Sequence, residues 1–140
     1  MLFRSFVAYG ASKTANILHA VEADRRLREM GIRAYAVHPG TVATSLARYM
    51  SSSDFSQLRK FVAANSEARG ESSDGFLDFV MPEHGAATQV WAAVSPELAD
   101  HGGLYLEECG ISDAVAPYAR DAQRAAELWM LSEKLCVIDC

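Results

Sequence analysis

Several features of specialised proteins are scarce or missing in this chain of 140 residues. No apolar run approaches the roughly 20 residues that a membrane-spanning helix requires, and the mildly apolar residues 1–8 are too few for the core of a secretory signal. Basic residues are outnumbered by acidic ones, 13 to 18, and form no stripe, which argues against nucleic acid as a partner. These absences favour a cytoplasmic protein without a membrane span.

Cysteine and histidine also show no pattern that indicates a metal or disulfide site. Cys109, Cys136 and Cys140 are odd in number and contain no CxxC pair, which argues against both a disulfide scaffold and a zinc site. The four histidines are scattered without ligand spacing. We therefore expect reduced thiols and no bound metal.

The first part of the chain predicts a helix followed by a buried strand. From Tyr9 to about Glu29, apolar residues recur at helical steps, and the predicted inner face contains Ala20, Ala23, Leu27 and Met30. Gly31 is a typical helix stop. Residues 33–38 are a short, mostly apolar run closed by Pro39-Gly40, as expected of a buried strand.

The rest of the chain predicts more helices and one more strand. A short helix is expected over 43–50, a helix marked by Phe55, Leu58 and Val62 after a cap at 51–54, and an exposed loop over 66–75. Pro82 begins a helix with the predicted buried stripe Ala86, Ala87, Val90, Trp91 and Val94. Leu104–Leu106 is the second strand, and the last helix has the predicted face Ala125, Leu128, Leu131 and Leu135.

These elements predict an α/β fold of about five helices and two firm parallel strands. A sheet of two parallel strands is too narrow to be stable alone and leaves both edges open. The 140 residues are therefore expected to form one incomplete domain.

Tyr9 and Lys13 are the first residues that could carry chemistry. At positions i and i+4 of a helix, the phenol and the ammonium group lie on one face. A nearby cation favours the phenolate, so such a pair can move a proton to or from an alcohol or carbonyl oxygen. The spacing alone favours a surface contact between an aromatic ring and a lysine.

The surroundings of the pair resemble a known family. The Tyr9-Gly-Ala-Ser-Lys13 segment and the later Pro39-Gly-Thr-Val-Ala-Thr44 segment resemble, in order and distance, two motifs of the short-chain dehydrogenases/reductases. Residues 82–91 and 103–107 resemble the late helix and last strand of bacterial members akin to retinol dehydrogenases. The resemblance covers nearly the whole chain and implies the C-terminal part of a Rossmann-like, doubly wound parallel sheet.

The resemblance implies a role for each motif residue. Tyr9 would exchange the proton with the substrate oxygen, and Lys13 would lower the pKa of Tyr9 and bind the nicotinamide ribose. The cofactor would be NAD or NADP.

The second motif would contact the nicotinamide end of this cofactor. Pro39 and Gly40 would shape the turn beside the nicotinamide, while the Val42 backbone and the Thr44 hydroxyl would hold its carboxamide. Thr44 could also cap a helix. Residues 45–80 would form a substrate lid, whose apolar side chains could meet an apolar substrate or pack on the core: Leu46, Tyr49, Met50, Phe55 and Phe61.

Other parts of the family pattern are missing from these residues. No Thr-Gly-x-x-x-Gly-x-Gly turn is present to bind a pyrophosphate, and no Asn-Asn-Ala-Gly strand. Ser5 is too close to Tyr9 to serve as the upstream catalytic serine. We therefore expect the nucleotide-binding N-terminal half to be absent.

Two functions follow as hypotheses. The first is a fragment of an NAD(P)-dependent oxidoreductase acting on a small alcohol or carbonyl substrate, inactive as a chain of 140 residues. The second is a non-catalytic protein that binds a partner, or a second copy, through the helix at 9–29 and the open sheet edge.

Overall fold

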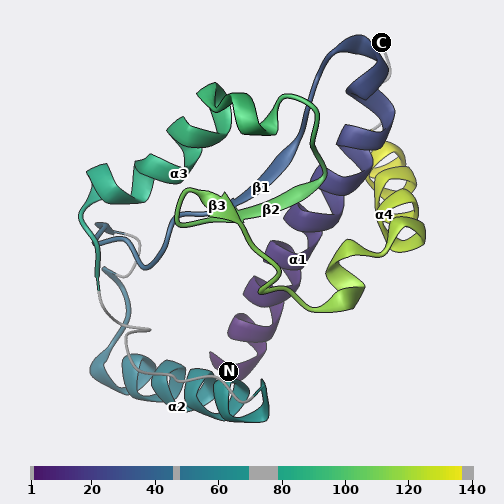
Figure 1. Ribbon diagram of the computed structural model, residues 1–140. Helices are drawn as coiled ribbons and strands as arrows, with labels where there is room; N and C mark the ends of the chain where they lie inside the picture. The colour runs from purple at the N-terminus through teal and green to yellow at the C-terminus, as the bar shows by residue number, and fades with distance from the viewer. Residues whose placement is uncertain (1, 46–47, 70–78, 137–140) are drawn as a thin grey trace.

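The computed structural model describes residues 2–45, 48–69 and 79–136 (Figure 1). Along these residues the chain forms four α-helices, three strands and three short 3-10 helices, in this order: α1 (Leu2–Leu27), η1 (Arg28–Met30), β1 (Tyr35–His38), α2 (Ser52–Arg69), α3 (Pro82–Val94), η3 (Pro96–Leu98), β2 (Leu104–Glu107), β3 (Gly110–Ile111), η4 (Pro117–Arg120) and α4 (Ala122–Leu135). None of the described helices combines the length and apolar character needed to cross a membrane.

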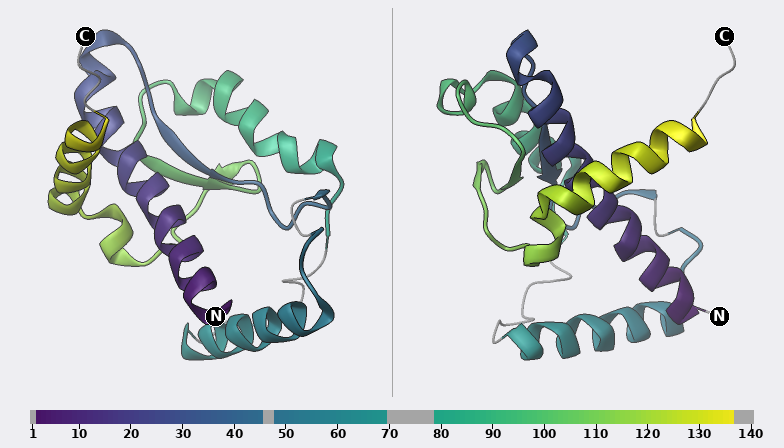
Figure 2. Two further views of the ribbon diagram at one scale, coloured as in Figure 1. Left: turned by 180° about the vertical axis from the view of Figure 1, so that it is seen from behind. Right: turned by 90° about the vertical axis from the view of Figure 1, so that its right-hand side faces the viewer.

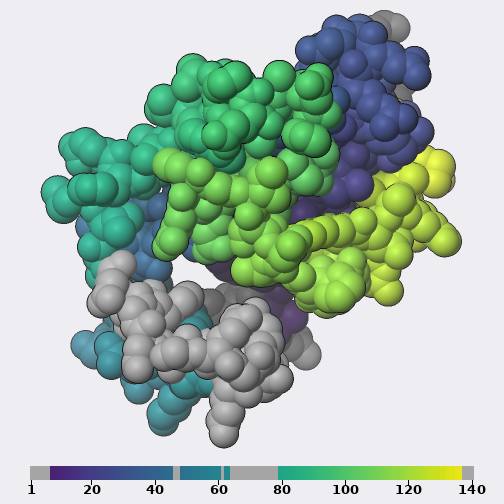
Figure 3. Space-filling model, in the orientation of Figure 1, coloured from purple at the N-terminus to yellow at the C-terminus, as the bar shows by residue number. Residues whose placement is uncertain are grey.

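The elements form a small three-layered body around the sheet. Helix α1 covers one face and α4 packs against α1, while α3 covers the other face (Figures 1 and 2). In the space-filling view, α3, the β2–β3 hairpin and α4 form one continuous body (Figure 3). This arrangement confirms the expected α/β fold, with four described helices where about five were predicted.

The sheet has a parallel pair and one short antiparallel strand. β1 runs parallel to β2, with Tyr35 opposite Leu104 and His38 opposite Glu107. β3 pairs with β2 through the turn Glu108–Cys109, whose φ angles of 50 and 54° are left-handed. The sequence did not predict β3, because a Glu-Cys turn lacks the Asn-Gly signal of such hairpins. The strand order β1-β2-β3 places β1 at an edge.

Several predicted boundaries need correction. α1 begins at Leu2 rather than Tyr9, since residues 2–8 contain no glycine or proline to stop it. The helix predicted over 43–50 is reduced, in its described residues, to a bend at Thr44 and one 3-10 turn closed by the hydrogen bond from the Arg48 N–H to the Ser45 carbonyl at 3.1 Å. α2 continues to Arg69, so the loop predicted at 66–75 is wrong at its start, and residues 70–75 lie outside the described part.

The predicted cap before α2 is confirmed at Ser51. The Ser51 hydroxyl accepts a hydrogen bond from the Asp54 N–H at 3.3 Å, and the Asp54 carboxylate accepts one from the Ser51 N–H at 2.7 Å. This reciprocal pair satisfies backbone donors at the helix start, as in a capping box.

The buried apolar core is small and consists mostly of alanine. Its members are Ala20, Ala23, Ala36, Leu98, Leu106, Ala119 and Ala125. The stripe predicted on α3 is wrong: Val90 and Val94 are 59 and 73% exposed, and α3 instead buries Gly85 and Thr88. A sheet of three short strands does not extend far enough to cover the apolar side of this helix.

The predicted inner faces of α1 and α4 are partly confirmed. Ala20, Ala23 and Ala125 are buried, but Met30 is 71% exposed because it follows the helix in η1, where the helical phase no longer holds. Leu131 and Leu135, near the end of α4, are also exposed.

The Asp24 carboxylate joins three segments at the amino ends of the strands. It accepts a hydrogen bond from the Ala34 N–H at 3.2 Å and pairs with the Arg33 guanidinium at 2.9 Å, although Asp24 is only 5% exposed. Gly102, just before β2, approaches so closely that a Cβ there would overlap this carboxylate. Asp24 thereby fixes the end of α1 against the starts of β1 and β2.

Glu22 is a second buried acid on α1, held by two arginines. Its carboxylate accepts hydrogen bonds from Arg25 and Arg26 at 2.7 Å, and its side chain is 1% exposed. The hydrogen bond from Arg25, assisted by Arg26, lowers the Glu22 pKa from 4.5 to about 2 against the opposing effect of burial. The buried carboxylate is therefore ionised at neutral pH.

Trp129 of α4 contacts two side chains of α1, His19 and Arg26. The His19 ring stacks on it with the centroids 5.1 Å apart, and the Arg26 guanidinium lies 4.9 Å from its centroid. Its indole N–H donates to Glu133 at 2.7 Å. This aromatic contact attaches α4 to α1.

Replacement of Gly102 by alanine is expected to destabilise the fold. The new Cβ would displace the Asp24 carboxylate, so Gly102→Ala should lower the free energy of unfolding by about 1–3 kcal/mol in urea titrations. Gly10→Ala is the matched control, because a Cβ at Gly10 meets nothing within 4 Å, and it should be neutral or stabilising. Equal stability of the two variants would contradict the role of Asp24.

The Glu22 ion pairs predict a loss of stability in acid. Because the folded pKa of about 2 lies below the ordinary 4.5, the contribution is complete above pH 4.5 and disappears as the pH falls towards 2. Urea titrations at about pH 6 and pH 3 should differ by about 2 kcal/mol through this residue. The Glu22→Gln variant should lose this difference in stability between the two pH values. The Glu97→Gln variant, changed at an exposed site, should retain the difference.

Candidate active site

Tyr9 and Lys13 lie one turn apart on α1, as predicted. The Lys13 Nζ atom lies 5.1 Å from the centroid of the Tyr9 ring, and both residues are exposed, with Tyr9 at 54%. The Ser12 hydroxyl between them donates to the Tyr9 carbonyl oxygen at 2.7 Å and so faces the helix backbone. The geometry presents a phenol and an ammonium group together to solvent.

The pair lies beyond the sheet because α1 is much longer than β1. The 26 residues of α1 span about 39 Å, whereas the four residues of β1 span about 13 Å. The end of the helix leads through a short turn into the start of the strand, so the two run antiparallel. The first turns of α1 therefore extend past the carboxyl end of β1 (Figure 2).

The second predicted motif begins at that carboxyl end. Gly40 adopts a φ of 76°, which turns the chain sharply after His38 and Pro39. The next residues are tied to Val80: its N–H donates to the Thr41 carbonyl, and its carbonyl accepts from the Ala43 N–H, both at 2.9 Å.

These two hydrogen bonds to Val80 determine the direction in which the backbone groups of Val42 point. Thr41 and Ala43 both bond towards Val80, so the alternation of an extended chain directs the N–H and C=O of Val42 to the opposite side. Gly85 of α3 packs against the Val42 side chain, with no room for a Cβ between them. The structure thus holds Val42 by its side chain and neighbours, with its own polar backbone groups turned outward. Thr44 follows in an exposed bend.

The two motifs lie at the same end of the sheet, one on α1 and the other after β1. The first turns of α1 and the end of β1 are separate in every view (Figures 1 and 2). α2 stands apart from the sheet at this same end. Of the apolar residues in the predicted lid, Tyr49 is 85% exposed and Met50 and Phe55 are half-buried; Leu46 and the Phe61 side chain lie outside the described part.

His38 and Glu107 form a polar pair at the carboxyl ends of β1 and β2 that the sequence did not single out. The His38 Nδ1 atom lies 3.3 Å from Glu107 Oε1 and also accepts a hydrogen bond from the Gly40 N–H at 3.2 Å. Glu107 accepts from the Ser112 hydroxyl at 3.1 Å. Burial, together with the charge of Glu107, raises the pKa of Tyr105 to about 12. The pair could not be predicted because it depends on the register of two distant strands.

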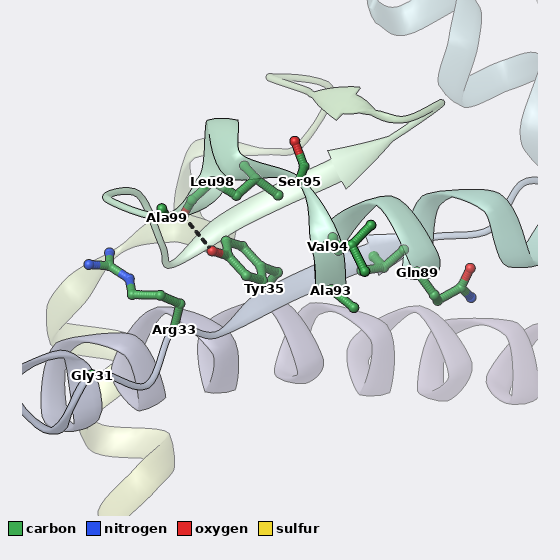
Figure 4. Close-up of a pocket in the computed structure, with 11 residues that line it drawn as sticks. Gly31, Arg33, Tyr35, Gln89, Ala93, Val94, Ser95, Leu98 and Ala99 are labelled. Atoms are coloured by element: carbon green, nitrogen blue, oxygen red, sulfur yellow. Dashed lines mark hydrogen bonds between the residues drawn. The ribbon is translucent and has the colours of Figure 1, made fainter.

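A cavity of about 600 Å³ lies elsewhere, between β1 and α3 (Figure 4). The Tyr35 hydroxyl lies in its wall, 2.8 Å from the carbonyl oxygens of Leu98 and His101, and burial raises the pKa of Tyr35. None of the predicted site residues lines this cavity, which is formed by Gly31, Arg33, Tyr35, Val37, Gln89, Ala92, Ala93, Val94, Ser95, Leu98 and Ala99.

No family model matches the chain, but curated proteins match nearly its whole length. It is 34% identical over 134 residues to a WW domain-containing oxidoreductase of Danio rerio, which covers 94% of this chain and 28% of that protein. It is 35% identical to the chloroplastic short-chain dehydrogenase TIC 32 A of Brassica napus, covering 91% of this chain and 36% of that protein. It is 29% identical to the short-chain dehydrogenase/reductase prx1 of Penicillium roqueforti, covering 95% and 39%.

The chain thus spans about a third of the length of these relatives. Their names agree with the resemblance carried by the two motifs. Over nearly all of its residues, the chain is similar to proteins named as an oxidoreductase or as short-chain dehydrogenases/reductases.

Proposed function

We propose that these residues form the acid–base part of an NAD(P)-dependent oxidoreductase that moves a hydride between a nicotinamide cofactor and an alcohol or carbonyl compound. The observation that carries the proposal is the Lys13 ammonium group 5.1 Å from the Tyr9 ring, in a chain homologous to dehydrogenases and reductases. An oxidoreductase has more support than a non-catalytic binding protein, because the relatives are named for that activity.

Tyr9 would hold and move the proton at the substrate oxygen. In reduction the phenol Oη donates its proton to the developing alkoxide, and in oxidation the phenolate accepts it from the alcohol. Lys13 lies on the same face of α1, with its Nζ atom 5.1 Å from the centroid of the Tyr9 ring. The exposure of both residues leaves their polar atoms accessible to a substrate.

The residues after β1 fit the nicotinamide end of the cofactor, which supplies the hydride when bound. The Val42 N–H and C=O, turned away from Val80, offer the donor and acceptor that a carboxamide needs, and Thr44 would add its hydroxyl. Pro39 and the left-handed Gly40 would bring the backbone close to the ring. Lys13 would contact the ribose.

The pyrophosphate end of the cofactor has no fitting residues here. No glycine-rich turn precedes a helix in these 140 residues. We therefore propose that the site is completed by further residues, equivalent to the part of the relatives that this chain does not span. NAD and NADP fit the described residues equally well.

The position of β1 at an edge of the sheet, among the described strands, supports this proposal. The Ala34 carbonyl accepts from the Gly103 N–H of the β2 side at 2.8 Å, so the alternation of the strand directs the backbone groups of Tyr35 and Val37 away from β2. The cavity beside them and the exposed Val90 and Val94 of α3 would be covered by the same missing part.

We also propose that residues 45–80 act as the substrate lid, since α2 stands apart from the sheet at the end where α1 begins (Figure 1). The motif-like stretches 82–91 and 103–107 support a branch akin to the retinol dehydrogenases. We further propose that two copies of the chain associate through residues 9–29 of α1.

The proposal predicts how activity depends on Tyr9. Alone, the 140-residue chain should not oxidise NADH or NADPH with a panel of aldehydes and ketones. Joined to the nucleotide-binding part of a relative such as TIC 32 A, it should turn over, and Tyr9→Phe should lower kcat by about 10²-fold or more because the proton donor is lost. The absorbance of the reduced nicotinamide measures the turnover of the chain alone, of the chimera and of its Tyr9→Phe variant.

Tyr118→Phe is the matched control, since Tyr118 is similarly exposed, at 52%, but lies on η4. It should leave kcat unchanged. A folded chimera without turnover, or full turnover in the Tyr9→Phe chimera, would contradict the proposed function.

A further inference from the structure

His38 has two partners that compete for one atom. Its Nδ1 atom accepts a hydrogen bond from the Gly40 N–H at 3.2 Å and lies 3.3 Å from the Glu107 carboxylate. To accept from Gly40, Nδ1 must be without a proton; to donate to Glu107, it must carry one. A single ring nitrogen cannot do both, so each protonation state of Nδ1 satisfies only one partner.

We propose that His38 is a positioning residue for the Pro39–Gly40 turn. When Nδ1 gains a proton, it loses the hydrogen bond from the Gly40 N–H and donates to the Glu107 carboxylate instead, and this exchange of partners releases the turn. The competition for Nδ1 stands on the geometry alone. Its effect on cofactor binding rests on the proposed function, because it requires Val42 and Thr44 to hold the nicotinamide.

The turn connects two parts that are separately fixed. Upstream, β1 is paired with β2 up to His38. Downstream, Thr41 and Ala43 are bonded to Val80, and Val42 is packed on Gly85. Gly40, with its φ of 76°, is the joint between them. The hydrogen bond from its N–H to His38 is therefore a direct restraint on the angle at which the Val42 segment leaves the strand.

The surroundings of His38 leave Glu107 as its main competitor. Both facing groups come from β2: the Glu107 carboxylate and the Tyr105 ring, whose centroid is 6.3 Å from that of His38. Tyr105 is neutral at physiological pH, since its pKa is about 12. The described residues of α1 and α3, which pack on the two faces of β1, form no ion pair with His38. The His38 side chain is 45% exposed, so its proton can exchange with solvent.

The protonation of His38 can be measured in the 140-residue chain without cofactor. Nitrogen NMR reports which ring nitrogen carries the proton, and hydrogen exchange at Gly40, relative to its intrinsic rate, reports the hydrogen bond. Over the pH range in which the nitrogen spectrum shows Nδ1 gaining its proton, Gly40 exchange should accelerate about fivefold to tenfold, which corresponds to the loss of one hydrogen bond. No change at Gly40 over this range would overturn the proposal.

Two variants and a control separate this effect from general loosening. In His38→Asn, the Asn carbonyl oxygen can accept from the Gly40 N–H at any pH, so the response at Gly40 should disappear. Glu107→Ala removes the competitor and should slow Gly40 exchange about fivefold at neutral pH. His101→Asn, at the opposite end of the sheet, should respond like the unmodified chain. A response that persists in His38→Asn would refute the role of Nδ1.

Activity provides an independent readout in the chimera with a relative's nucleotide-binding part. The KM for the cofactor should rise about fivefold in acid, and His38→Asn should make it independent of pH while the pH dependence of kcat stays unchanged. A chimera without turnover would refute the proposed function but leave the exchange results on Gly40 intact. Turnover with an identical pH dependence of KM in both proteins would refute the positioning role instead.

Discussion

The buried Asp24 carboxylate determines how the other parts of this fold are arranged. It accepts from the backbone N–H where β1 begins, pairs with Arg33, and leaves space only for a glycine at position 102 before β2. Buried carboxylates are costly unless each oxygen is satisfied. The requirement to satisfy this one therefore places the end of α1 and the starts of both parallel strands together, in a chain whose apolar core is otherwise mostly alanine.

Local signals allowed the sequence to predict most elements of this fold. The Gly31 stop, the Ser51–Asp54 cap, Pro82 at a helix start and the Tyr9–Lys13 spacing each depend on residues within a few positions of one another. The family resemblance of the two motifs agrees with the relatives found. The roles of Val42 and Thr44 stay predictions.

The failures concern contacts between distant segments. The exposure of Val90 and Val94 depends on how wide the sheet is, which the helical period of α3 cannot report. The His38–Glu107 pair depends on a register that brings together residues 69 positions apart in the chain. The hairpin at Glu108–Cys109 uses left-handed residues without a glycine, which tertiary contacts such as the hydrogen bond from the Cys109 N–H to Thr88 must support.

Because α1 extends far beyond the sheet, the proposed catalytic pair of Tyr9 and Lys13 is sensitive to changes at the other end of the helix. Tyr9 lies 15 residues before Asp24, and that stretch of helix is about 22 Å long. If this segment of α1 tilts as a rigid body about Asp24, Tyr9 moves by about 2 Å for each 5° of tilt. Errors of about 1 Å already slow enzymatic reactions considerably. In the proposed function, a substitution at the Asp24–Arg33 contact would therefore slow the reaction without unfolding the protein, because it would displace the distant Tyr9 phenol.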